Sequence, residues 1–105
     1  MIDARRMEVF CSVHQNNKCL NVVSAKVLDE FSFTEFRALS VYYFGDGAAK
    51  ATAILNPEFK FIDTVKTSAS NLINLAWKTY TTNDFEDVAY FEPYYLKDFV
   101  AGKKD

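Results

Sequence analysis

The chain is poor in the residues that define disordered, disulfide-rich and zinc-bound proteins. Its 105 residues include three glycines, two prolines, two cysteines and one histidine, whereas half of the sequence is hydrophobic. So few glycines and prolines in so apolar a sequence exclude a disordered or low-complexity chain. Two cysteines cannot build a disulfide framework, and one histidine with two cysteines falls short of the four ligands of a closed zinc site. We therefore expect a packed core and two reduced thiols.

Long apolar runs and a positive net charge are also missing. No stretch of about 18 apolar residues is present, and the opening residues 1–6 lack the apolar region of a signal peptide. The 12 basic and 14 acidic side chains give a net charge of -2, which provides no general attraction for a phosphate backbone. We expect a cytoplasmic protein that does not cross a membrane and does not itself bind nucleic acid.

The first 27 residues predict a β-hairpin. Apolar and polar residues alternate from Met7 to Val13, as in a strand with one buried face, and residues 19–27 form a second arm rich in Val and Leu. If Asn16-Asn17 is a two-residue loop, His14 lies opposite Cys19 and Cys11 lies opposite Val22. The two cysteines then point to opposite faces of the sheet.

The rest of the chain predicts a small mixed α/β layer. Ser32 and Glu35 have capping-box spacing, and the apolar stripe of the longest helix is expected to pack on the sheet. Pro93 confines the aromatic segment around it to a sheet edge or a loop. The predicted elements, in chain order, are a helix at 33–39, a strand at 41–44, a helix at 48–55, a strand at 59–63 parallel to the previous one, a long helix from 67–70 to Tyr80, an aromatic segment at 88–96 and a solvated tail at 101–105.

Gly45-Asp46-Gly47 is the one motif with a candidate ligand, because it lies between a predicted strand and a predicted helix. Backbone N–H groups at such a position can bind a phosphate. The motif lacks the third glycine of a dinucleotide fingerprint and the Lys-Ser/Thr of a P-loop, and a purely structural turn is the favoured interpretation. The charged pairs near the start, such as Asp3 with Arg5, are expected to be solvated.

No catalytic residue is predicted. His14 is the single histidine, and neither a nucleophile elbow nor a cysteine-centred signature accompanies it. The aromatic run of Tyr90, Phe91, Tyr94, Tyr95 and Phe99 lacks interleaved basic residues, which a single-strand nucleic acid site would need. These rings are expected to serve in packing and interfaces.

Three stretches together resemble a known family. They are Asp3-Ala4-Arg5-Arg6-Met7-Glu8-Val9-Phe10, the central Gly45-Asp46-Gly47, and Glu92-Pro93-Tyr94-Tyr95-Leu96-Lys97. Their order and spacing resemble the C-terminal half of the bacterial TsaB (YeaZ) family. The stretch Phe85-Glu86-Asp87-Val88-Ala89-Tyr90-Phe91-Glu92-Pro93 looks especially like members from Bacteroidetes-type bacteria. The match covers nearly all of the chain.

The resemblance implies an actin-like, ribonuclease-H-like half-domain spanning residues 1–105, with the N-terminal lobe absent. TsaB-type proteins are non-catalytic scaffolds that work with TsaD-like and TsaE-like proteins in synthesis of threonylcarbamoyladenosine at position 37 of certain tRNAs. The older glycoprotease label derives from the relation of the family to TsaD, whose metal is held by paired histidines on a helix. His14 is solitary and on a predicted strand, so these histidines have no counterpart here. The resemblance also implies that Gly45-Asp46-Gly47 corresponds to the glycine motif that contacts adenosine in nucleotide-binding relatives, in a degraded form. No cofactor is expected.

Two alternatives to the scaffold remain: a degraded nucleotide-binding module of the actin-like ATPase superfamily, and a glycoprotease-type peptidase. We further expect the surface that would face a missing lobe to be apolar, with a possible homodimer through it or through an unpaired edge near Tyr90 to Tyr95.

Overall fold

The computed structural model describes residues 1–97, which fall into two compact units, Met1–Thr67 and a second one that begins at Ser68. The predicted tail at 101–105 and the ring of Phe99 lie outside the described residues. Within the described part of the chain, no helix is long and apolar enough to cross a membrane.

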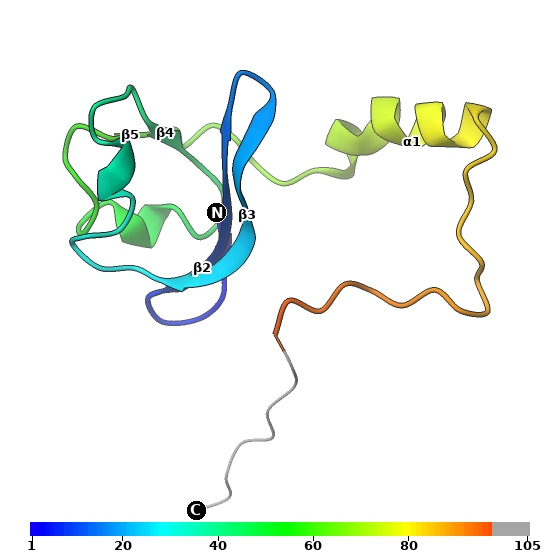
Figure 1. The fold of residues 1–105 in the computed structure, drawn as a ribbon, viewed down its shortest axis with the longest axis horizontal. Helices are drawn as coiled ribbons and strands as arrows, with labels where there is room; N and C mark the ends of the chain where they lie inside the picture. Colours follow the sequence, from blue (N-terminus) through cyan, green and yellow to red (C-terminus); the bar gives the residue numbers. More distant parts are fainter. Residues whose placement is uncertain (98–105) are drawn as a thin grey trace, which may run out of the picture. The chain divides into compact units, whose positions relative to one another are not determined.

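The first unit is built on a three-stranded antiparallel sheet in the order β1-β2-β3, formed by β1 (Ile2–Asp3), β2 (Glu8–Gln15) and β3 (Lys18–Val27). Figure 1 shows β2 and β3 as one long hairpin. The predicted two-residue loop is confirmed, since Asn16 and Asn17 have φ of 51° and 63°, as a type I′ turn requires. The predicted alternation is confirmed too, because Val9 and Cys11 are buried.

The register of this hairpin follows the prediction only near the turn. His14 pairs with Cys19 as expected, but Cys11 pairs with Ser24, so the prediction that Cys11 faces Val22 is wrong. Two irregularities, between Cys11 and Val13 and between Val13 and His14, insert extra residues into β3 and shift every later pair. Cys11 is buried and Cys19 is exposed, and both are free thiols. Burial raises the pKa of the Cys11 thiol.

A strand that the sequence did not predict, β1, pairs with β2 through Ile2 opposite Phe10 and Asp3 opposite Val9. Arg5 and Arg6 reverse the chain between the two strands with φ of 83° and 48°. The turn is closed by the Ala4 N–H, which donates to the Glu8 carbonyl at 3.1 Å. Two residues are too few to show an alternating pattern, so this strand is set by its partners rather than by its own sequence.

The second sheet confirms the predicted parallel unit. Strand β4 (Tyr42–Tyr43) pairs in parallel with β5 (Lys60–Phe61), and the rings of Tyr43 and Phe61 stack with centroids 5.6 Å apart. The helix between them is shorter than the predicted 48–55, because only the 3-10 helix η2 (Ala49–Ala51) forms. The Ala49 carbonyl is occupied by both the N–H and the hydroxyl of Thr52, which favours the tighter turn over an α-helical ladder.

The predicted capping box at Ser32 does not form. The Ser32 hydroxyl instead donates to Asp29 Oδ1 at 3.0 Å and accepts from the Asp29 N–H at 2.9 Å. Phe33 follows with φ of 63°, and the predicted helix at 33–39 is reduced to the 3-10 helix η1 (Thr34–Phe36). The competing aspartate three residues upstream thus turns an apparent helix start into a tight loop.

The core of the first unit lies between the sheet and the segments that follow it. It combines residues of β2, β4, the alanine-rich turn and the loops beside them, and it comprises Val9, Cys11, Leu28, Phe33, Tyr43, Ala48, Ala51, Leu55 and Phe59. Ala48 and Ala51 are fully buried, so the alanines that suggested a helix serve mainly as small core residues.

The second unit contains the predicted long helix, as the 3-10 turn η3 (Ala69–Leu72) followed by α1 (Ile73–Thr81). The Ser68 side chain caps it by accepting from the Ser70 N–H. No residue of α1 is buried, in contrast to the packed apolar face expected from the sequence. Residues 88–96 contain a turn and no strand, as the loop alternative at Pro93 allowed. Antiparallel and parallel sheets with a helix make the chain α/β.

Candidate functional site

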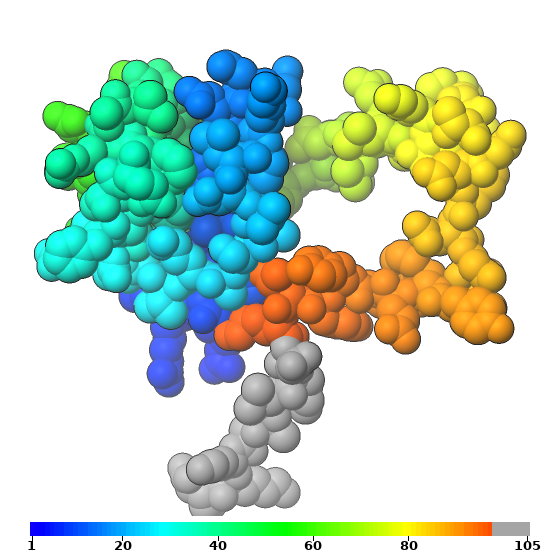
Figure 2. All heavy atoms as spheres, in the orientation of Figure 1, coloured from blue at the N-terminus to red at the C-terminus, as the bar shows by residue number. Residues whose placement is uncertain are grey.

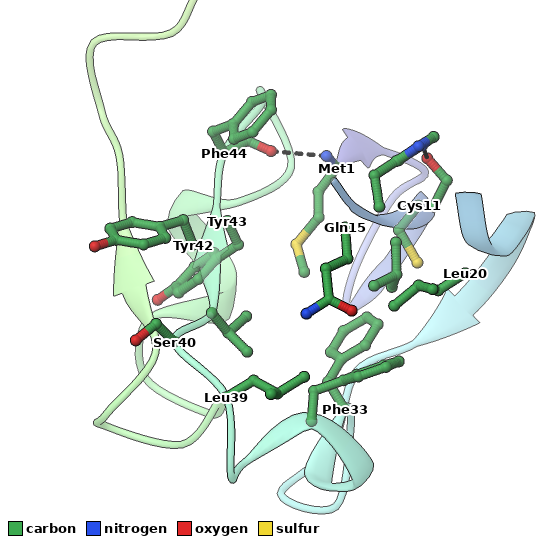
Figure 3. A pocket seen from close by; sticks show the side chains of 15 residues that line it. Met1, Cys11, Gln15, Leu20, Phe33, Leu39, Ser40, Tyr42, Tyr43 and Phe44 are labelled. Atoms are coloured by element: carbon green, nitrogen blue, oxygen red, sulfur yellow. Dashed lines mark hydrogen bonds between the residues drawn. The ribbon is translucent and has the colours of Figure 1, made fainter. Parts of the chain in front are cut away.

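The candidate site is the place where β1 meets the loop Gly45-Asp46-Gly47. The Asp3 N–H donates to Asp46 Oδ1 at 2.8 Å, and the Gly47 N–H donates to the Met1 carbonyl at 3.2 Å. The Met1 amine donates to the Phe44 carbonyl at 2.7 Å, which is the dashed bond of Figure 3. Two of the three stretches singled out in the sequence are therefore joined across more than 40 residues.

The two glycines make this contact possible. Gly45 has φ of 112°, and a Cβ atom on it would lie 1.9 Å from the Met1 carbonyl oxygen. A Cβ atom on Gly47 would lie 2.9 Å from the Asp3 nitrogen. Both distances are shorter than atoms tolerate, so any larger residue would push β1 away. Glycine is therefore required at both positions because the loop backbone lies close to the backbone of residues 1–3.

Lys50 completes the site, although sequence reasoning did not select it. Its Nζ donates to Asp3 Oδ1 and, at 2.7 Å, to the Glu8 carbonyl. The Lys50 hydrogen bond, followed by the Arg5 N–H, holds the pKa of the Asp3 carboxyl below its ordinary value. Lys50 is the only basic residue of the stretch 45–55. Its position one turn after the glycine loop was the available signal.

This arrangement is poorly suited to a phosphate. The N–H groups of Gly47 and Ala48 already donate to the Met1 and Gly45 carbonyls, and the carboxylates of Asp3 and Asp46 lie at the same loop. The helix that follows has three residues of 3-10 geometry, so it offers little of the dipole that attracts anions to an α-helix N-terminus. The polar groups of the loop instead bind the backbone of β1 and the residue before it.

Two of the depressions in the first unit are lined by candidate residues or by the strands beside them. One, of about 320 Å³, is lined by Gly45 and Asp46 together with Asp63 and Lys66, among others. The larger, of about 460 Å³, has mainly apolar walls, with Cys11 and Phe33 on one side and Tyr43 opposite (Figure 3).

The larger depression is also lined by a hydrogen-bonded pair of side chains, one with a hydroxyl and the other with an imidazole. Ser12 Oγ and His14 Nε2 lie 2.9 Å apart on neighbouring outward positions of β2. Both side chains are exposed. Across residues 1–97, no group of three or more His, Cys, Asp or Glu side chains is arranged to hold a metal ion.

The third stretch of the resemblance belongs to the second unit. Glu92, Pro93 and Tyr95 are exposed, and Leu96 is half-buried. Of the other selected residues, Ala4, Arg5 and Glu8 form the turn beside Asp3. The candidate residues thus divide between a docked loop and an exposed aromatic segment.

No family model, no curated protein and no solved structure matches this chain.

Replacing Gly45 by Ala tests whether this loop is built for close approach. The Cβ atom meets the Met1 carbonyl at a positive φ, so we expect a loss of at least about 1–2 kcal/mol in the free energy of unfolding measured with urea. The matched control is Asn17→Gly, which relieves a φ of 63° in an open turn and should change stability by no more than about 0.5 kcal/mol in the unfavourable direction. Equal stability of the Gly45→Ala and natural chains would contradict the proposed role.

Replacing Lys50 by Met should raise the pKa of Asp3 toward its ordinary value, because its strongest hydrogen-bond donor is lost. A carboxyl whose pKa is depressed in the folded state stabilises the fold above its unfolded pKa, and this contribution disappears as the pH falls through the folded pKa. The acid side of the stability curve should therefore be less steep in Lys50→Met. Carboxyl carbon NMR of Asp3 measures the titration directly. Lys18→Met at the hairpin turn is the control, and an unchanged Asp3 titration in Lys50→Met would contradict the assignment.

A calorimetric titration with Mg-ATP tests the nucleotide alternative. We expect no saturable heat, because the loop N–H groups are engaged and two carboxylates lie beside them. Saturable binding that Asp46→Arg alters would instead assign a nucleotide to the loop.

Proposed function

We propose that this chain is the C-terminal part of a TsaB-type scaffold. Such a protein has no catalytic role of its own and supports TsaD-like and TsaE-like partners in forming threonylcarbamoyladenosine at position 37 of tRNA. The observation that carries the proposal is the hydrogen bond from the Asp3 N–H to the Asp46 carboxylate, together with the neighbouring hydrogen bond from the Gly47 N–H to the Met1 carbonyl. Two of the three stretches that together resemble the family are hydrogen-bonded to each other.

The order of elements supports the same proposal. An antiparallel three-stranded sheet is followed by a parallel strand–helix–strand unit and then by a longer helix. This is the order expected of one ribonuclease-H-like, actin-like half, which is the finer fold that we propose for residues 1–105. The departures from it are the short lengths of η1 and η2, the division of the strands between two sheets and the absence of buried residues in α1.

The chemistry of the site supports a scaffold rather than an enzyme. The polar groups around Gly45-Asp46-Gly47 are used to hold β1, and Lys50 neutralises the carboxylate of Asp3. Groups bound to one another in this way stabilise a loop and leave little to polarise a substrate. Among the described residues, no contact supports the nucleotide-binding or the peptidase alternative as the contact between β1 and the glycine loop supports the scaffold.

Large exposed apolar side chains are the expected counterpart of a scaffold function. In the first unit Ile2, Val22 and Phe31 are more than half exposed, and in the second unit the helix and the segment after it add further ones. Exposed apolar surface of this extent is typical of interaction surfaces. We propose that partner contact in the intact protein, or a homodimer, covers part of it.

A chimera tests the proposed function. The chain replaces the C-terminal half of a TsaB protein whose N-terminal half is retained, and the chimera is added to purified TsaD-like, TsaE-like and TsaC-like proteins with tRNA and ATP. We expect tRNA modification, measured by nucleoside mass spectrometry, from the chimera and none from the chain alone.

A chimera carrying Gly45→Ala should modify less tRNA, and one carrying Asn17→Gly should match the unsubstituted chimera. A folded chimera that supports no modification would contradict the family assignment. Modification restored by the chain alone would contradict the need for a second lobe.

A further inference from the structure

The segment from Asp84 to Tyr95, here called the acidic–aromatic segment, combines two properties that are seldom found together on a solvated loop. Its large apolar side chains are strongly exposed: 62% for Phe85, 95% for Val88, 84% for Tyr90 and 79% for Tyr94. Hydrophobic side chains are usually left exposed singly, whereas these follow one another along a dozen residues.

The charge of this segment has one sign. It contains Asp84, Glu86, Asp87 and Glu92, and the sequence has no Lys or Arg between Lys78 and Lys97. The whole chain has a net charge of -2, so negative charge is concentrated here rather than spread evenly. A surface that complements the segment must therefore be apolar at its centre and basic at its rim.

Local contacts hold the segment in a defined shape. The Asp87 carboxylate accepts from the Ala89 N–H at 2.9 Å, and the Asp87 carbonyl accepts from the N–H groups of Tyr90 at 3.0 Å and Phe91 at 2.8 Å. Pro93 fixes one further backbone angle. A segment with a preset turn loses less conformational entropy on binding than a free chain does.

An aromatic ladder connects the segment to α1. The rings of Trp77 and Tyr80 stack at 5.7 Å between centroids, and Phe85 meets Tyr80 edge-on at 5.8 Å. All three rings are at least 60% exposed. The side chains of α1 project at the surface in Figure 2 (yellow), and the segment follows it in orange. The segment is thus anchored to the helix at its start, through the contact of Phe85 with Tyr80.

We propose that the acidic–aromatic segment, together with Trp77 and Tyr80, is a docking ligand for a protein whose apolar groove is bordered by Lys and Arg. The aromatic rings enter the groove, and the carboxylates of Asp84, Glu86 and Glu92 meet the basic rim. Like charges disfavour the same segment of a second copy as the occupant. This inference does not depend on the TsaB-type function.

The test uses two synthetic 18-residue amphipathic helices with one leucine face, one carrying lysines and the other glutamates on the polar face. Trp77 is the only tryptophan of the chain and is 65% exposed, so its fluorescence reports on this surface directly. The leucine–lysine peptide should shift Trp77 emission to the blue with saturation near one peptide per chain, and it should bind more weakly at high salt. The leucine–glutamate peptide should cause no saturable shift.

Variants separate docking from general charge attraction. Asp84→Asn with Glu86→Gln and Glu92→Gln should weaken binding about tenfold, and Tyr94→Ser with Tyr95→Ser should reduce it comparably. The matched controls lie in the first unit: Glu30→Gln with Glu35→Gln and Glu58→Gln, and Phe31→Ser. These replace exposed groups of the same kind and should leave binding unchanged.

Three results would overturn the proposal. The first is an equal loss of binding in the control variants, and the second is equal binding of both peptides, because either would mean that no groove-and-rim recognition occurs. The third is a concentration-dependent dimer that buries Trp77 without peptide, which sedimentation would detect and which would assign the surface to a second copy of the chain.

Discussion

The docking of β1 on the loop Gly45-Asp46-Gly47 is the contact on which the rest of the first unit depends. β2 pairs with β1 on one side and β3 on the other, so the position of β1 sets where the hairpin lies. The same loop begins at the end of β4 and leads into the buried alanines that pack under Val9. A few hydrogen bonds therefore connect the antiparallel and the parallel parts of the unit, and the two glycines allow the close approach that these bonds need.

The polar groups at this contact act together. Asp46 accepts the Asp3 N–H, while Lys50 joins the Asp3 carboxylate to the Glu8 carbonyl across the β1–β2 turn. An exposed ion pair alone contributes little to stability. Lys50 is mostly buried and also satisfies a backbone carbonyl, so its value lies in fixing the geometry of a turn whose two arginines have positive φ.

The sequence predicts well what depends on local patterns and poorly what depends on partners. The alternation in β2, the Asn16-Asn17 turn and the parallel β4–β5 pair follow from period, turn chemistry and strand–loop–strand order. The strand β1 is too short to show a pattern of its own, and both its docking on the glycine loop and the role of Lys50 involve residues more than 40 positions apart, so neither could be predicted. The capping box at Ser32 failed for the opposite reason: Asp29, only three residues upstream, competes for the same hydroxyl.

The helix of the second unit forms without a buried face. This helix, α1, has nine residues, fewer than the dozen or more that an isolated helix needs in water, and none of them is buried. The cap at Ser68 and the ring contacts from Trp77 to Phe85 contribute to its order, but they remove little apolar surface from water. Burial is the dominant favourable term in folding and association. A surface that covers these rings would therefore stabilise the helix as well as the complex, so that recognition and helix stability are coupled in this unit.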